Sequence, residues 1–154
     1  MRKVIVVGAG IAGTAVADEL VMRGFTAVTV FDRGPLFKTG GATSHAPGLV
    51  TRTSPSQMML GLADVTINKL LGMDLDGQPC FHDVGSVEVA TTPERLEYLS
   101  RRLEFAHAWG FTDNALIDPG ECARRNPLLD ASTILGGYAT TGEGIGKALR
   151  GAER

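Results

Sequence analysis

The 154-residue sequence has little of what marks several large classes of protein. Its two cysteines, Cys80 and Cys122, lie far apart and form no C-x-x-C pair, so we interpret them as buried, reduced thiols of a cytoplasmic protein. Lys and Arg number 15 against 17 Asp and Glu, and the net charge of −2 provides no basic surface. A nucleic-acid partner is therefore not expected.

Long apolar runs are also missing. The apolar stretch after Arg2 and Lys3 resembles a secretory signal, but glycines interrupt it, and it is too short and too glycine-rich to span a bilayer. We therefore expect a cytoplasmic protein without a membrane partner. The three histidines form no metal-binding pair, and neither a P-loop nor a nucleophilic triad stands out.

What the sequence does contain is concentrated near its start. Residues 4–7 are a β-branched run typical of a strand buried on both faces. A G-x-G-x-x-G turn occupies residues 8–13, and the helix that follows is predicted to stop at Gly24. Residues 27–31 form a second apolar strand with Asp32 at its tip. This order predicts a βαβ unit that binds a dinucleotide.

The chemistry of dinucleotide binding explains the spacing. Gly8 permits the tight turn, Gly10 lets a pyrophosphate approach the backbone, and Gly13 lets the helix lie close to the sheet. The helix N-terminus, including Ile11 and Ala12, offers free N–H groups to phosphate. Asp32, 19 residues after Gly13, is placed to accept the ribose hydroxyls and disfavours NADP. Arg33 is equally compatible with the cofactor phosphates and with solvent.

Residues 40–49 are the second informative stretch. They combine glycines with the hydroxyls of Thr43 and Ser44 and the imidazole of His45. Such a loop can wrap a phosphate and place a histidine against a ring. Composition alone slightly favours a flexible surface loop, because clusters of glycine and serine usually form one.

The remainder of the chain alternates helices and short strands. Three helices are predicted from an N-cap followed by proline, with caps at Ser54, Thr92 and Asp118. Extended structure is predicted at residues 80–90, with a bend or hairpin at Gly85, and at 134–140. Residues 142–146 are predicted to turn, and a further helix begins at Lys147.

Four segments resemble one family. The loop 41–49 resembles that of the dimethylglycine oxidase and sarcosine dehydrogenase group, which are FAD-dependent amine oxidoreductases of the D-amino-acid-oxidase type. The resemblance continues through residues 81–92, 127–130 and 134–137 and covers nearly the whole chain. Together these segments are far more specific than the glycine motif alone.

The resemblance implies a role for each part of the predicted site. FAD would lie on the glycine turn and Asp32, with residues 42–45 on its flavin side and a covalent bond between His45 and the flavin. The reaction would be oxidative N-demethylation of dimethylglycine or sarcosine, a small methylated amine with a CH–NH donor group. The predicted cofactor-binding residues are Gly8, Gly10, Ile11, Ala12, Gly13, Asp32, Arg33, Ala42, Thr43, Ser44, His45 and Leu49.

The resemblance also indicates a shortened chain. Family members are several times longer, and residues 141–144 depart from a family pattern of a proline and an Asp-Gly pair. We expect an α/β fold in which residues 1–154 form the N-terminal part of a Rossmann-like FAD-binding domain, with inserted helices and a short β-hairpin. The substrate and folate-type domains, with the family's catalytic residues, would be absent. The chain would then be a weakly active or inactive fragment, one piece of a split flavoenzyme completed by another polypeptide, or a non-catalytic NAD- or FAD-binding module.

Overall fold

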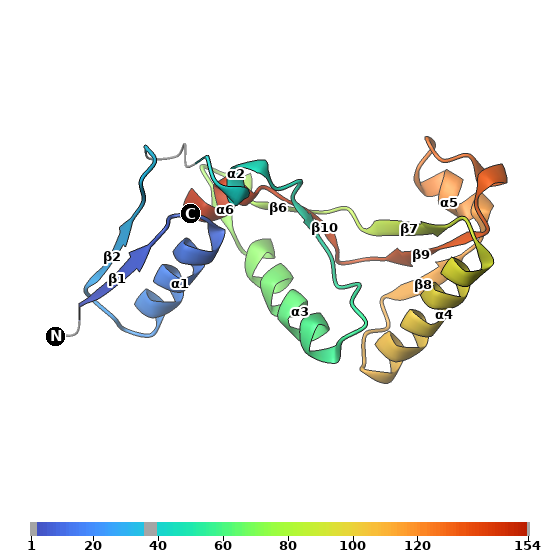
Figure 1. Cartoon of the computed structure of the whole chain (residues 1–154), viewed down its shortest axis with the longest axis horizontal. Coiled ribbons are helices and arrows are strands. Elements are labelled where there is room, and N and C mark those ends of the chain that lie inside the picture. Colours follow the sequence, from blue (N-terminus) through green and yellow to red (C-terminus); the bar gives the residue numbers. More distant parts are fainter. Residues whose placement is uncertain (1–2, 36–39, 154) are drawn as a thin grey trace. The chain divides into compact units, whose positions relative to one another are not determined.

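The computed structural model describes residues 3–35 and 40–153, and these divide into two compact units (Figure 1). Of the described residues, unit 1 contains 3–35, 40–49, 70–82 and 146–153, and unit 2 contains 50–69 and 83–145. Each unit is described by itself. Across the described ranges, no helix combines the length and apolar character needed to cross a membrane.

Unit 1 begins with the predicted βαβ element. Strand β1 (Val4–Val7) pairs in parallel with β2 (Val28–Phe31), and helix α1 (Ile11–Met22) connects them. Gly24 has φ +85°, a left-handed conformation that suits glycine at a helix C-terminus, and the amide of Phe25 closes the last turn on the Leu20 carbonyl. The predicted order of strand, turn, helix and strand is confirmed.

One face of the β1–β2 pair carries α1, and the other is bare. Val6 lies on the α1 side, because its side chain is next to the position a Cβ of Gly13 would occupy. Ile5 and Val7 alternate with it, so they point to the opposite face, where they are 64% and 85% exposed. Of the strands in the described residues, only β2 pairs with β1. A parallel sheet is normally covered on both faces, so this pair is an incomplete sheet.

The rest of unit 1 consists of short elements. They include a hairpin of β4 (Asp74–Leu75) and β5 (Gln78–Pro79), which turns at Asp76 and Gly77, both with positive φ. The fold therefore contains the short hairpin expected from the sequence, but in residues 74–79. The remaining elements of unit 1 are α2 (Ala42–His45) and α6 (Ala148–Glu153). Three short strands, β3 (Leu49–Val50), β6 (Phe81–Asp83) and β10 (Gly144–Gly146), belong to neither unit alone and form a sheet in the order β3-β10-β6.

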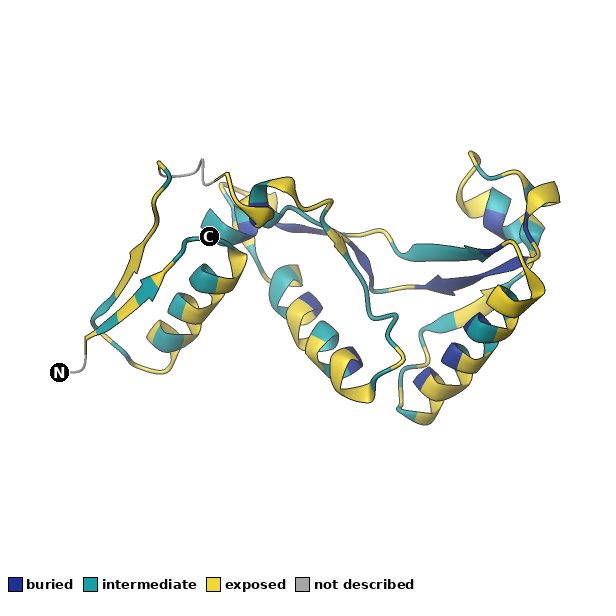
Figure 2. Cartoon of the chain, in the orientation of Figure 1, coloured by how far each residue is buried: buried dark blue, intermediate teal, exposed yellow. Residues whose placement is uncertain are grey.

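Unit 2 is built on an antiparallel sheet in the order β7-β9-β8, and β9 is buried along its whole length (Figure 2). Ala90, Leu99 and Tyr138 form its core, contributed by β7, α4 and β9. Thr92 and Asp118 cap α4 and α5 as predicted. The elements that lie wholly within this unit are β7 (Ser86–Ala90), α4 (Pro93–Ala108), β8 (Asn114–Ile117), α5 (Pro119–Arg125), the 3₁₀ helix η1 (Ala131–Thr133) and β9 (Gly136–Thr140).

Three local expectations need correction. Helix α3 (Gln57–Leu71) begins two residues later than a cap at Ser54 would place it, because the Ser56 carbonyl accepts the Leu60 amide and its hydroxyl faces the Met59 amide. At Gly85 the chain bends, with φ +72°, and β7 pairs with β9, so the hairpin alternative is wrong there. Within the predicted turn 142–146, the last three residues form β10.

Candidate functional site

The glycine turn of unit 1 has the backbone geometry that a phosphate cradle requires. Gly8 has φ +104°, and a Cβ there would meet nothing within 4 Å, so the turn is open on that side. A Cβ at Gly13 would lie 1.9 Å from the Gly8 carbonyl oxygen, so only glycine allows α1 to start this close to the turn. Gly10 is the N-cap of α1 and has no side chain of its own to cap the helix.

The first turn of α1 also has suitable electrostatics for an anion. It contains no acidic residue, so the positive end of the helix dipole is not neutralised locally. Amides in the first turn have no partner inside their own helix. The amide of Ile11 donates to Thr43 Oγ1 at 2.9 Å, and the amides of Ala12 and Gly13 follow it. An oxygen-rich anion such as a pyrophosphate fits this set of donors.

Asp32 stands beside the turn and is held by two backbone amides. Its Oδ2 accepts the Ala9 amide at 2.7 Å, and its Oδ1 accepts the Gly34 amide at 2.8 Å. These hydrogen bonds lower the pKa of Asp32 below its usual value, and the bond from Ala9 has the largest effect. The side chain is therefore a carboxylate at neutral pH. Each carboxylate oxygen can accept a second hydrogen bond, which leaves room for two hydroxyl donors.

A cavity of about 450 Å³ opens next to Asp32 within unit 1. Its walls come from the glycine turn after β1, from the end of β2 and the residues that follow it, from α1 and from α6. No sequence motif indicated that α6 would form a wall, because this six-residue helix carries none and lies far along the chain from the glycine turn. The lining residues are Ala9, Thr14, Val30, Phe31, Asp32, Gly34, Pro35, Leu149, Ala152 and Glu153.

The second informative stretch forms the short helix α2 instead of an irregular loop. His45 Nδ1 lies 3.0 Å from the Gly41 carbonyl oxygen and 3.1 Å from Ser44 Oγ. A carbonyl oxygen can only accept, so the contact with Gly41 is a hydrogen bond in the tautomer that carries a proton on Nδ1, and in that tautomer Nε2 carries the lone pair. The ring is exposed, so Nε2 is accessible to a ligand.

The structure brings most of the predicted residues into two connected turns. Gly8, Gly10, Ile11, Ala12 and Gly13 form the glycine turn and the start of α1, Asp32 bonds to this turn through Ala9, and Thr43 bonds to it through Ile11. Ala42, Ser44 and His45 share α2 with Thr43. Arg33 is exposed next to Asp32, and Leu49 is an exposed residue of β3, 59% accessible to solvent.

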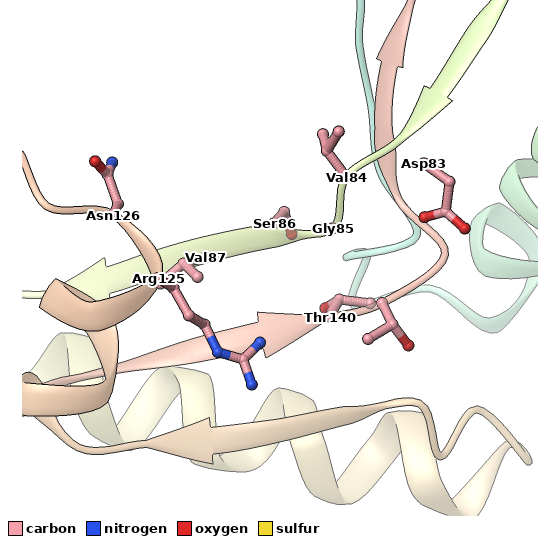
Figure 3. Close-up of a pocket in the computed structure, with 9 residues that line it drawn as sticks. Asp83, Val84, Gly85, Ser86, Val87, Arg125, Asn126 and Thr140 are labelled. Atoms are coloured by element: carbon pink, nitrogen blue, oxygen red, sulfur yellow. The ribbon is translucent and has the colours of Figure 1, made fainter.

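Unit 2 contains a separate cavity of about 680 Å³, which includes none of the predicted site residues. Figure 3 shows Arg125 and Asn126 at the end of α5, with Asp83 to Gly85 before β7 and Ser86 and Val87 at its start. Its polar groups are partly engaged elsewhere: Arg125 Nε donates to Glu121 at 2.6 Å, and the Ser86 hydroxyl donates to Glu143 at 2.5 Å. Of the two cavities, only that of unit 1 adjoins the glycine turn and Asp32.

A family model described as FAD dependent oxidoreductase matches residues 3–151 of the chain. The chain therefore belongs to this family of FAD-dependent oxidoreductases. The resemblance to the amine oxidoreductases of the D-amino-acid-oxidase type is confirmed at the family level.

Individual relatives agree. The chain is 28% identical over 142 residues to mitochondrial dimethylglycine dehydrogenase of Rattus norvegicus, covering 91% of this chain but 16% of the relative. The crystal structure of glycine oxidase from Geobacillus kaustophilus matches 98% of the chain and 42% of its own, at 25% identity and a TM-score of 0.75. L-proline dehydrogenase from P. horikoshii shares the fold, with a TM-score of 0.84 at 21% identity, over 99% of this chain and 40% of its own.

Proposed function

We propose that unit 1 binds FAD and that the chain is the cofactor-binding part of an amine oxidoreductase acting on a methylated glycine. The observation that carries the proposal is the hydrogen-bonded assembly of the open glycine turn, the first-turn amides of α1 and the Asp32 carboxylate. The similarity to dimethylglycine dehydrogenase supports the substrate class. Residues 1–154 then correspond to the N-terminal part of an FAD-binding domain.

Each group of residues has a defined task in this proposal. The amides of Ala12 and Gly13 bind the pyrophosphate, and Asp32 accepts the hydroxyls of the adenosine ribose. A carboxylate at this position repels a 2′-phosphate, which argues against an NADP-type ligand. When bound, FAD supplies the hydride acceptor for the oxidation of a carbon–nitrogen bond. Ala42, Ser44, His45 and Leu49 are the proposed flavin-side residues, and Arg33 is a proposed phosphate-side residue.

A covalent link between His45 and the cofactor is part of the proposal. The bond from Nδ1 to the Gly41 carbonyl favours Nε2 as the atom of attachment, because that nitrogen retains its lone pair. The chain would be incubated with FAD and precipitated with acid. A yellow pellet from the wild type and a colourless pellet from His45→Ala would support the link. A wild-type supernatant that retains all the colour would show reversible binding only.

The binding proposal itself is tested by titration with FAD and NAD. We expect the fluorescence of FAD to be quenched when it binds, and we expect FAD to bind more tightly than NAD. Asp32→Ala should weaken FAD binding, whereas Asp74→Ala, an exposed aspartate in β4, is the control. Tighter binding of NAD would overturn the flavin assignment in favour of a non-catalytic NAD module. An unchanged affinity of Asp32→Ala would contradict its ribose role.

Turnover requires a separate experiment, because the chain spans 16% of the length of its dehydrogenase relative. The chain would be mixed with the remaining segment of a family member, and dimethylglycine-dependent dye reduction would be measured. Activity of the mixture alone would identify a split enzyme completed by a second polypeptide. No association at micromolar concentration would rule that arrangement out. The expected cytoplasmic location stays a prediction, since the named relative is mitochondrial.

A further inference from the structure

Thr43 has a position that differs from that of its neighbours in α2. It is buried, with 9% of its surface exposed, whereas Ala42 and His45 are exposed. Its Oγ1 accepts the amide of Ile11 at 2.9 Å, across 32 positions of sequence. Ile11 is the first residue of α1, and its amide has no partner within the helix. The Thr43 hydroxyl therefore satisfies one specific donor of the dinucleotide turn.

The second glycine of the motif is fitted to this side chain. A Cβ at Gly10 would lie 3.0 Å from Thr43 Oγ1, closer than ordinary van der Waals contact. Gly10 consequently leaves space for a threonine hydroxyl as well as for a phosphate. The glycine turn and α2 therefore fit together only because position 10 has no side chain next to Thr43 Oγ1.

The contact matters because of what lies on either side of it. On one side, Thr43 takes the Ile11 amide, so the next two amides of α1 remain available for an anion. On the other side, His45 follows two residues later in the same short helix, and its ring is held to the Gly41 carbonyl of that turn. If Thr43 moved away from α1, the distance between His45 and the first-turn amides of α1 would change.

We propose that Thr43 is a positioning residue, whose hydroxyl joins the His45 turn to the glycine turn and so sets the spacing between the flavin and pyrophosphate halves of the site. The proposal deepens the proposed function and rests on FAD as the ligand. Thr43 acts through Ile11 and α2, because its hydroxyl oxygen accepts a protein amide.

Three variants of the full chain test the role. Thr43→Val removes the hydroxyl and keeps the shape, Thr43→Ser keeps the hydroxyl, and Thr66→Val makes the same change on the exposed side of α3, where the hydroxyl donates to Leu62. We expect Thr43→Val to raise the Kd for FAD by up to about tenfold, the net value of one hydrogen bond, because FAD binding would then have to fix α2 against α1 without it. The other two variants should bind as the wild type does.

The visible circular dichroism of bound flavin separates positioning from stability. Both the spectrum and the Kd are measured well below the melting temperature of each variant. If Thr43 only stabilised the fold, neither would change under these conditions. We expect Thr43→Val alone to alter the spectrum, because α2 would no longer be fixed relative to α1. Wild-type affinity and spectrum in Thr43→Val would overturn the proposal.

Amide hydrogen exchange tests the contact without any cofactor. The Ile11 amide should exchange more slowly than the Ala12 amide in the wild type and in Thr43→Ser, and should lose this protection in Thr43→Val. Equal rates for Ile11 and Ala12 in the wild type would overturn the inference even if FAD binds. Conversely, protection of Ile11 in a chain that binds no FAD would leave the contact in place and refute the proposed function.

Discussion

At the scale of the residue, Gly13 is constrained by the backbone of the turn before it. Replacing it with alanine puts a Cβ 1.9 Å from the Gly8 carbonyl oxygen, so α1 must move away from the turn. We expect Gly13→Ala to lower the free energy of unfolding by about 1–3 kcal/mol, the range of overpacked sites. Urea unfolding measures it, with Gly61→Ala as the control.

Gly61 is the matched glycine because it also lies inside a helix, α3, but has open space around its missing Cβ. Alanine there should raise the free energy of unfolding by up to about 1 kcal/mol, the difference in helix propensity. A similar effect of both substitutions would show that the Gly8 contact does not limit position 13.

Glu143 is a second residue with a specific consequence, because its carboxyl is fully buried in unit 2. Burial raises its pKa above the ordinary value of 4.5, although hydrogen bonds from the Ser86 hydroxyl and the Arg52 amide act in the opposite direction. Because the pKa of Glu143 is higher in the folded state than in the unfolded state, protonation of its carboxyl favours folding. Glu143 therefore contributes stability that is complete below pH 4.5 and is lost as the pH rises through the folded-state pKa.

Replacement by glutamine removes this titration. We expect the wild type to lose stability relative to Glu143→Gln as the pH is raised from 4 to 8, measured by urea unfolding at each pH. The exposed Glu97→Gln on α4 serves as the control for the chemical change. A constant difference between wild type and Glu143→Gln across this range would contradict the raised pKa.

At the scale of the element, capping residues fix where helices begin. Thr92 accepts the Arg95 amide at 3.2 Å and is followed by proline, so α4 starts where the sequence predicts. We expect Thr92→Ala to lower the free energy of unfolding by about 1 kcal/mol and Thr92→Asp to restore it. Thermal unfolding followed by far-ultraviolet circular dichroism measures both, and equal melting temperatures for alanine and aspartate would contradict the cap.

The same elements show what the sequence could and could not predict. Local rules were sufficient for β1, α1 and β2, because strand pattern, glycine spacing and the Gly24 stop agree in one short segment. They were also sufficient for α4 and α5, where a cap, a proline and an acid coincide. At α3 both Ser54 and Ser56 have a side chain suited to an N-cap, and the sequence pattern predicted Ser54 where the structure has Ser56.

Contacts between distant segments were beyond these rules. The pairing of β7 with β9 and the approach of α6 to the cavity beside Asp32 depend on where the chain returns, which no local pattern encodes. The Thr43–Ile11 bond has the same origin. The sequence identified both residues as part of a site, but only the fold shows that one satisfies the other.

At the scale of the whole molecule, the bare side of β1 predicts self-association. In the part of the chain that the structure describes, β1 has one edge without a partner strand, and its Ile5 and Val7 are exposed on the adjoining bare face. A strand of this kind is a template for pairing with another chain. We expect the purified chain to form oligomers as its concentration rises, and Val7→Lys to reduce this, in sedimentation velocity. Val84→Lys, an exposed valine of unit 2, should leave association unchanged. Equal association of all three proteins would exclude the β1 edge as the contact.

The composition of the two units has a consequence for synthesis. Unit 1 draws on three segments of the chain and includes both its first and its last described residues, whereas most of unit 2 is one continuous stretch. On a ribosome, the glycine turn therefore emerges before residues 83–145, and residues 146–153, which belong to the same unit as the turn, emerge after them. Unit 1 is therefore completed only after the segments of unit 2 that lie between its own segments have been made, and during that interval β1 and β2 are accessible to chaperones and proteases.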